Sequence, residues 1–302
     1  CTGAPPRPVV PPALAGDGLA TTQISEAFVS APVPDVEVDS LATWLSPEGE
    51  TRVIASGKHG GVLLVFDGEN GHLLQEAGER GGLSYPNGLA TFGDWLFVVE
   101  RDAARVRVFG LPQFNALGQF GEGALQTPYG LWVHETAPDE VEVFVTDSYP
   151  LDAAVPARAS PDRRIKRFRV RLDEEPVRGF ELDAFGETAP ESALRWVESI
   201  SGDAVYDRLV IAEEHPEHRR HGPLIYRLDG KFSGERLGEG LFLGEPEGIA
   251  LYECQSGNGY WIAADQSRED NRFHVFDRAT LAHLGSFRGE TVSNTDGIVL
   301  HP

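Results

Sequence analysis

The sequence has few cysteines, few basic residues and no long apolar run. It contains two Cys and no Met among 302 residues, and 26 Lys and Arg stand against 47 Asp and Glu, which gives a net charge of −21. Two Cys can form at most one disulfide. The deficit of positive charge argues against nucleic acid or an anionic membrane surface as a partner, since both require basic neutralisation, and it favours cations. No stretch approaches the ~18 apolar residues of a membrane-spanning helix, although 41% hydrophobic residues suffice for a core.

The first 20 residues are rich in Pro, Ala and Gly, and they predict a flexible tether over residues 1–20 before a single domain over residues 21–302. Cys1 followed by this stretch resembles the N-terminus of a mature bacterial lipoprotein, in which the first Cys carries the lipid. We therefore expect an extracytoplasmic protein, periplasmic or anchored in the outer membrane, that meets a membrane only through a lipid on Cys1. The alternative is that position 1 has no such meaning. Cys254 is expected to be a buried thiol near a strand end.

Short β-type runs separated by Gly, Asp and Asn turns fill the rest of the chain. Convincing amphipathic helices are scarce, so we predict an all-β fold. The most hydrophobic runs are residues 52–55, 62–66, 95–99, 141–145, 208–212 and 260–263.

A fixed unit recurs: an inner strand, a turn, a hydrophobic strand, a loop and a strand that ends on an aromatic residue. The inner strands begin 48, 42, 69, 49 and 49 residues apart, and the longest interval contains a polar insertion at 148–164. Such periods predict a β-propeller, and six units predict six blades. Because Pro302 follows the sixth inner strand closely, we expect the last blade to be closed by the N-terminal strand around residues 26–30 or to be incomplete. The first residues of the six inner strands are Asp39, Asn87, Tyr129, Glu198, Glu247 and Asp296.

These six positions should converge at one end of the channel, because the innermost strands of a propeller line its axis. Four of the six are carboxylates, which repel one another at close range unless they are protonated or neutralised by a metal ion. Oxygen ligands without clustered Cys or His suit a hard cation, Ca²⁺ first and Mg²⁺ second. Taken singly, each acid could be an ordinary solvated turn residue, but four in register favour a metal site.

Several repeats carry distinctive motifs. Residues 247–252 read Glu-Gly-Ile-Ala-Leu-Tyr, residues 257–266 Gly-Asn-Gly-Tyr-Trp-Ile-Ala-Ala-Asp-Gln, and residues 274–278 His-Val-Phe-Asp-Arg. Residues 294–298 read Asn-Thr-Asp-Gly-Ile and residues 208–214 Arg-Leu-Val-Ile-Ala-Glu-Glu. Together these segments resemble the bacterial β-propeller phytases, calcium-dependent phosphatases that cleave inositol polyphosphates. Residues 39–45 resemble a degenerate form of the opening motif of that family, and the likeness spans residues 35–302 but is weaker in the second and third blades.

The resemblance implies a six-bladed, 3-phytase-like phosphomonoester hydrolase with Ca²⁺ as its cofactor and phytate or a similar phosphorylated small molecule as its substrate. Calcium would make the negative mouth locally positive and activate a water molecule. We expect a monomer. The positions that match calcium ligands or acidic site residues are Asp39, Glu198, Glu214, Glu247 and Asp296, of which Glu198, Glu247 and Asp296 are assigned to catalysis. The positions that match groups touching phosphate, or a metal that bridges to it, are Lys58, Arg101 and Tyr129.

The sequence also departs from the family pattern. A basic phosphate contact of the third blade falls on Ser148, two residues of the opening motif are Ser40 and Leu41, and the closing strands after Asp-Gly-Ile are absent. Arg219 and Arg220, in the loop at residues 215–221, would compensate by binding phosphate, unless this loop is simply an exposed polar segment. Its three His do not have the spacing of a rigid zinc-binding face, because Pro216 breaks any helix.

Two other functions are compatible with these patterns. One is a calcium-dependent lactonase or esterase, since other six-bladed propellers hold a cation in the channel, but Lys58 and Arg101 favour phosphate. The other is a non-catalytic propeller lipoprotein that binds a partner on its top face and keeps the acidic ring as a structural calcium site, which the missing cation at Ser148 favours.

Overall fold

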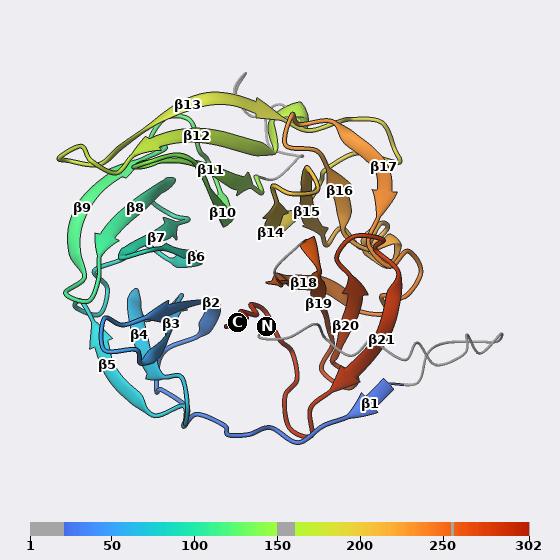
Figure 1. The fold of residues 1–302 in the computed structure, drawn as a ribbon, viewed down its shortest axis with the longest axis horizontal. Helices are drawn as coiled ribbons and strands as arrows, with labels where there is room; N and C mark the ends of the chain where they lie inside the picture. The colour runs from blue at the N-terminus through green and yellow to red at the C-terminus, as the bar shows by residue number, and fades with distance from the viewer. Residues whose placement is uncertain (1–20, 150–160, 255–256, 302) are drawn as a thin grey trace.

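The computed structural model describes residues 21–149, 161–254 and 257–301, and the predicted tether 1–20 lies outside these ranges. Their strands form five sheets that surround a central axis like the blades of a propeller (Figure 1). The all-β prediction is confirmed, since the helices in the described ranges are the one-turn segments η1 (Pro161–Arg163) and η2 (Arg219–His221). No described helix has the length and apolar character needed to cross a bilayer.

Each blade contains a four-stranded antiparallel meander whose strands run outward from the axis in chain order. The strands of the five blades are β2 (Val38–Leu45), β3 (Thr51–Gly57), β4 (Val62–Asp67) and β5 (Leu73–Ala77); β6 (Pro86–Phe92), β7 (Trp95–Glu100), β8 (Arg105–Gly110) and β9 (Asn115–Phe120); β10 (Pro128–Ala137), β11 (Glu140–Asp147), β12 (Ile165–Arg171) and β13 (Arg178–Phe185); β14 (Val197–Asp203), β15 (Arg208–Glu213), β16 (Leu224–Tyr226) and β17 (Phe232–Arg236); and β18 (Glu245–Glu253), β19 (Gly259–Gln266), β20 (Arg272–Asp277) and β21 (His283–Arg288).

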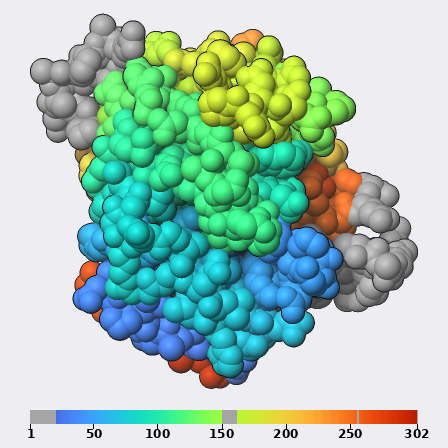
Figure 2. All heavy atoms as spheres, turned by 90° about the vertical axis from the view of Figure 1, so that its left-hand side faces the viewer, coloured from blue at the N-terminus to red at the C-terminus, as the bar shows by residue number. Residues whose placement is uncertain are grey.

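The core lies between the faces of successive blades. Four hydrophobic clusters join the first blade to the second, the second to the third, the third to the fourth and the fourth to the fifth. Strands such as β7 and β15 are therefore buried on both faces and consist of continuous apolar residues rather than an alternating pattern. At the rim, the N–H of Val177 donates to the carbonyl of Leu117 at 2.9 Å and joins the second and third blades, which lie side by side along one flank of the molecule (Figure 2).

The prediction of six blades is wrong: the structure has five. The sector between the fifth blade and the first holds no sheet in the described chain, and it is crossed by residues 24–37 near the rim and by residues 289–301 running towards the axis (Figure 1). The N-terminal strand does not close a sixth blade either. It is β1 (Thr21–Gln23), which pairs in parallel with β21 as a fifth strand of the fifth blade, while residues 26–30 form no strand.

The position of a sixth inner strand is nevertheless filled by the C-terminal segment. The N–H of Gly248 donates to the carbonyl of Asp296 at 2.8 Å, and the N–H of Gly297 donates to the carbonyl of Asp39 at 3.1 Å. The segment is also held by Asn271, whose side-chain oxygen accepts the N–H of Thr295 at 3.0 Å. The last turn of the chain thus joins the fifth blade to the first without forming a sheet.

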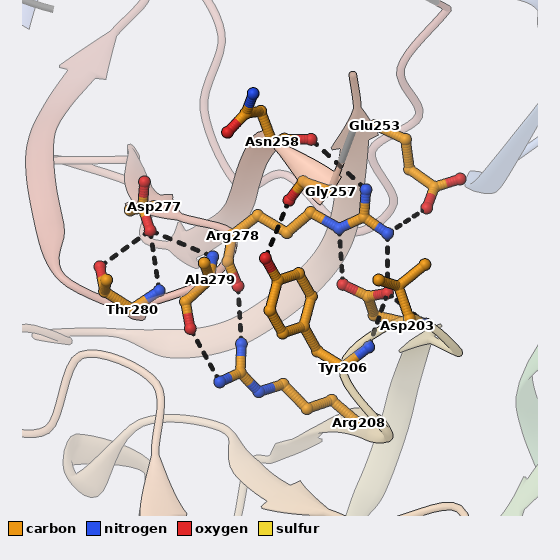
Figure 3. Close-up of polar contacts among 11 residues, drawn as sticks. Asp203, Tyr206, Arg208, Glu253, Gly257, Asn258, Asp277, Arg278, Ala279 and Thr280 are labelled. Atoms are coloured by element: carbon orange, nitrogen blue, oxygen red, sulfur yellow. Dashed lines mark hydrogen bonds and ion pairs between the residues drawn. The ribbon is translucent and has the colours of Figure 1, made fainter. Parts of the chain in front are cut away.

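On the end of the ring away from these inner-strand starts, a buried ion pair joins the fourth and fifth blades (Figure 3). The guanidinium of Arg278, which is 2% exposed, donates to both carboxylate oxygens of Asp203 at 2.6 and 2.7 Å and to Glu253 at 2.5 Å. Arg208 in turn donates to the carbonyls of Arg278 and Ala279. This bidentate pair fixes the relative orientation of the two blades, because a planar guanidinium can form two parallel hydrogen bonds with a carboxylate in only a few orientations.

Glu26 clamps the two segments that cross the open sector. Its carboxylate accepts the backbone N–H groups of Glu290, Thr291 and Val292 at 3.2, 2.8 and 2.9 Å, and these bonds lower its pKa to about 2. We expect Glu26→Ala to speed hydrogen exchange at Thr291 and Val292 and to lower the melting temperature at neutral pH. The wild-type advantage should be complete above the ordinary carboxyl pKa and should fade as the pH falls towards 2, because protonation then removes the acceptor charge.

The matched control for this clamp is Glu290→Ala, which removes only a bond from the Ser25 hydroxyl. Equal exchange rates in the Glu26 and Glu290 variants would show that Glu26 does not hold the C-terminal segment.

Candidate metal and phosphate site

A β-bulge at the start of the inner strand recurs in every blade and places the first residues of these strands at the axis. In all five sheets the pairing of the inner strand with the next one is interrupted at the same two residues, for example between Pro86 and Leu89 and between Val197 and Ile200. Such a bulge takes two residues out of the ladder and re-aims their side chains. Hydroxyl groups replace the lost partners: the N–H of Gly130 donates to the Thr146 hydroxyl at 2.8 Å, and the N–H of Ser40 donates to Ser56 at 3.0 Å.

The second residue of each interrupted pair must be small, because neighbouring inner strands touch there. A Cβ on Gly88 would lie 2.6 Å from the carbonyl oxygen of Tyr129, and one on Gly130 would lie 2.4 Å from that of Glu198. The same clash, at 2.8 Å from the Asp39 carbonyl, would occur at Gly297. This close contact explains the glycine that follows four of the six channel residues, including the one in the C-terminal segment. The first and fourth blades have Ser40 and Ser199 at the equivalent position.

The structure brings the predicted carboxylates together at one mouth of the channel. Carboxylate oxygens of Glu198, Glu214 and Glu247 lie within 4.8 Å of one another. Together with Asp296, these residues line a cavity of about 610 Å³. Oε1 of Glu214 is buried there without a hydrogen-bond partner.

A second group of predicted residues lies beside this cluster. The ammonium of Lys58 contacts Asp39 at 3.1 Å and donates to the Tyr129 hydroxyl at 3.0 Å, and that hydroxyl lies 3.4 Å from Asp39. Lys58 is thus a largely buried cation rather than the solvated surface lysine that is common at such positions.

Burial sets the charge state of the mouth. It raises the pKa of Asp39 to about 6 against the opposing charge of Lys58, and it raises that of Glu198 to about 7 against a hydrogen bond from Tyr129. The pKa values of Glu214 and Glu247 are raised well above the usual range, first by burial and then by neighbouring carboxylates. Burial and these carboxylates also raise the pKa of Tyr129, so its hydroxyl keeps its proton. Without a cation, the mouth therefore holds protons at pH values where free carboxyls have lost them.

The other predicted cations are distributed unevenly. Arg219 lines the mouth and pairs with Glu245, whereas Arg220 is exposed and does not line it. Arg101 stacks on the ring of Tyr85 and pairs with Asp102 at 2.8 Å, and none of its contacts in the described chain reaches the carboxylate cluster.

At Ser148 the structure places no cation, as the sequence indicated. The backbone N–H of this residue donates to the carbonyl of Thr127 at 2.9 Å. The rest of the predicted insertion at residues 150–160 lies outside the described ranges.

Sequence reasoning missed three residues of the mouth. Gln266 donates to Asp296 at 2.6 Å and orients it. Asn87, recognised as a channel position but not as a site residue, is fully buried and neither atom of its amide has a partner. Arg268 lines the mouth, is exposed, and makes no ion pair within the described ranges. The signal for these two residues was their position: Gln266 is the last residue of β19, directly after Ala-Ala-Asp, and Arg268 lies two residues further on.

The overall fold resembles solved β-propellers. A chain of the nidogen/laminin complex matches with 16% identity over 88% of this chain and 86% of that chain, at a TM-score of 0.56. Hydrazine synthase of Kuenenia stuttgartiensis matches with 12% identity over 82% of this chain and 64% of its own, at a TM-score of 0.49. A DUF4221 family member from Bacteroides vulgatus matches with 14% identity over 84% and 82%, at 0.46. No protein-family model and no curated protein matches the sequence. At these identities the likeness concerns the fold alone.

The raised carboxyl pKa values predict an unusual pH dependence. In chelator, the native state holds protons on Asp39 and Glu198 that the unfolded state releases near pH 4, so these groups reduce the free energy of unfolding as the pH rises from about 4 to about 7. Urea titrations should show Glu198→Gln gaining stability relative to wild type across this window. Glu135→Gln, an exposed exchange on β10, is the control. A constant difference between wild type and Glu198→Gln would show that Glu198 titrates normally.

Proposed function

We propose that the mouth binds Ca²⁺ and that the protein is a calcium-dependent phosphomonoester hydrolase acting on inositol polyphosphates or similar substrates. The observation that carries this proposal is the convergence of Glu198, Glu214 and Glu247 within 4.8 Å. Three buried carboxylates at that range are costly unless protonated or neutralised.

The residues fit a hard divalent cation. The donor set consists of carboxylate oxygens and lacks the thiolates and imidazoles that softer metals prefer. Oε1 of Glu214, buried without a donor, is the kind of orphaned acceptor that a cation would satisfy. Bound there, Ca²⁺ would supply positive charge that attracts the phosphate and stabilises the charge developed during hydrolysis.

The chain's own groups would orient the substrate. Lys58 and the protonated hydroxyl of Tyr129 offer donors beside the carboxylates, and Arg219 and Arg268 line the cavity. Arg268 supports a polyphosphate substrate most directly, because its guanidinium is exposed at the mouth without an ion pair in the described structure. It would supply a phosphate-binding cation in place of the one that is missing at Ser148.

A non-catalytic protein that uses calcium only for stability is the second candidate. It is favoured by the pairing of Lys58 with Asp39 and of Arg219 with Glu245, since each cation would have to leave a carboxylate before holding a phosphate. Release of phosphate from p-nitrophenyl phosphate and from phytate, with and without Ca²⁺, separates the two.

Calcium should raise the melting temperature, because an ion that binds only the native state stabilises it by mass action. Glu198→Gln removes one ligand charge and should weaken Ca²⁺ binding at least about tenfold, which corresponds to about 1.4 kcal/mol of binding free energy. Turnover should fall with it while the circular-dichroism spectrum stays native, because the blades do not depend on this side chain. Calorimetric titration of Ca²⁺ measures the change, with Glu135→Gln as the control. Unaltered calcium affinity in Glu198→Gln would exclude the proposed ligand set.

The substrate class is tested at Arg268. Loss of one charge-assisted hydrogen bond to phosphate costs about 1.5 to 3 kcal/mol, or roughly tenfold to a hundredfold in KM. Arg268→Ala should raise the KM for phytate by this factor and leave hydrolysis of p-nitrophenyl phosphate nearly unchanged. Arg220→Ala, an exposed arginine outside the mouth, should change neither. Equal losses on both substrates would place Arg268 in the structure of the site rather than in recognition of a second phosphate.

A further inference from the structure

The loop that follows β15 gathers two imidazoles and a carboxylate beside the mouth. Ligand atoms of His215, Glu217 and His218 all lie within 4.8 Å of one another, and His215 and His218 have ring centroids 5.5 Å apart. The sequence gave no reason to expect this, because Pro216 excludes the helical spacing that usually aligns two His on one face. The structure shows another way to align them: the chain turns at Pro216, and the N–H of His218 donates to the carbonyl of His215 at 2.7 Å.

The loop is anchored before any ligand arrives. Glu213, fully buried at the end of β15, accepts the N–H groups of His215 at 3.0 Å and Trp196 at 3.1 Å. The Trp196 ring packs edge-on against His215 with centroids 5.0 Å apart. The N–H of Glu217 points at Nδ1 of His215 at 3.4 Å; this long contact uses the single lone pair of the neutral ring and must break when the ring binds an ion. An arrangement fixed by buried groups loses less entropy when it binds an ion than a free loop does.

The chemistry of these three side chains differs from that of the mouth. Two imidazoles and one carboxylate form a donor set that Zn²⁺ uses in sites with three protein ligands and a fourth position open to water. Ca²⁺ prefers oxygen ligands alone. We propose that His215, Glu217 and His218 form a binding site for a divalent transition-metal ion of the zinc class, separate from the carboxylate cluster.

The local charges are compatible with this assignment. The pKa of His218 is lowered, first by burial and then by the positive charge of Arg195. Arg219, the next residue, is already paired with Glu245, and His221 lies near Glu239 at 3.6 Å. An ion held by this loop would also fix the backbone that carries Arg219, and hence one lip of the mouth.

The test is calorimetric titration of Zn²⁺ into the full chain in saturating Ca²⁺, with Co²⁺ absorption as a second readout. Wild type should bind one Zn²⁺ at this site and should give the visible bands of Co²⁺ bound to nitrogen ligands. His215→Ala and His218→Ala should each weaken Zn²⁺ binding at least about tenfold, and Glu217→Gln should weaken it less. The matched control is His59→Ala, which removes an exposed His beside Glu37 that has no second imidazole in contact.

Two outcomes would overturn the proposal. Zn²⁺ binding that survives unchanged in both His variants would exclude the loop. Zn²⁺ binding that is lost in Glu198→Gln and retained in His218→Ala would place the ion in the mouth instead.

A second measurement does not depend on a His variant that folds. Co²⁺ should quench the emission of Trp196, so the quenching should be absent in Trp196→Phe; equal quenching in both proteins would contradict the assignment. Because all these readouts report binding, the zinc site is judged independently of whether the calcium mouth hydrolyses phosphate.

Discussion

The close approach of backbone to backbone at the axis governs the architecture of this protein. Six pairs of residues, each a channel residue followed by Gly or Ser, meet around the ring. At the four glycines, Gly88, Gly130, Gly248 and Gly297, a Cβ would clash with a carbonyl of the next pair. The bulge that makes room for this contact also turns the preceding side chain towards the channel. One steric requirement thus gives both the packing of the inner strands and the convergence of the site. The sixth position needs no sheet, because this contact requires only a short segment, and residues 296–297 provide it.

The buried carboxylates concentrate negative charge where the fold can least screen it. Lys58 offsets part of that charge near Asp39, but around Glu198, Glu214 and Glu247 the pKa shifts indicate that protons remain in the absence of a cation. Carboxyl pKa values raised in this way are typical of functional sites, where the arrangement of charges is unfavourable for stability. At the other end of the ring, the buried charges of Arg278 and Asp203 are closely paired. This contrast between the two ends of the ring supports the proposal that the mouth binds a cation.

Much of this arrangement could be predicted from the sequence, because a repeat of about 48 residues places equivalent positions in register without any knowledge of contacts. The predicted runs fell within β3, β4, β7, β11, β15 and β19, and the six channel positions lie on the axis as expected. Blade number was overestimated because the last inner segment carries the Asp-Gly signature of a blade without the strands that follow it. Cys254, predicted to be buried, directly follows β18 and is only half-buried. The contributions of Gln266 and Arg268 depend on distances between segments, which periodicity does not encode.

The position of Asp296 has a consequence for how the protein is made. Four of the five blades can pack against the one before them as soon as both have been synthesised, since each interface joins neighbours in the chain. The mouth is different, because Asp39 comes from the first blade and its neighbour across the open sector comes from the final residues of the described chain. Its assembly must wait for a contact between residues more than 250 positions apart in the sequence. A nascent chain would therefore carry nearly complete blades while the acidic cluster is still open on one side. A cation bound to the cluster would act last, by holding together the first blade and the C-terminal segment after the blades have formed.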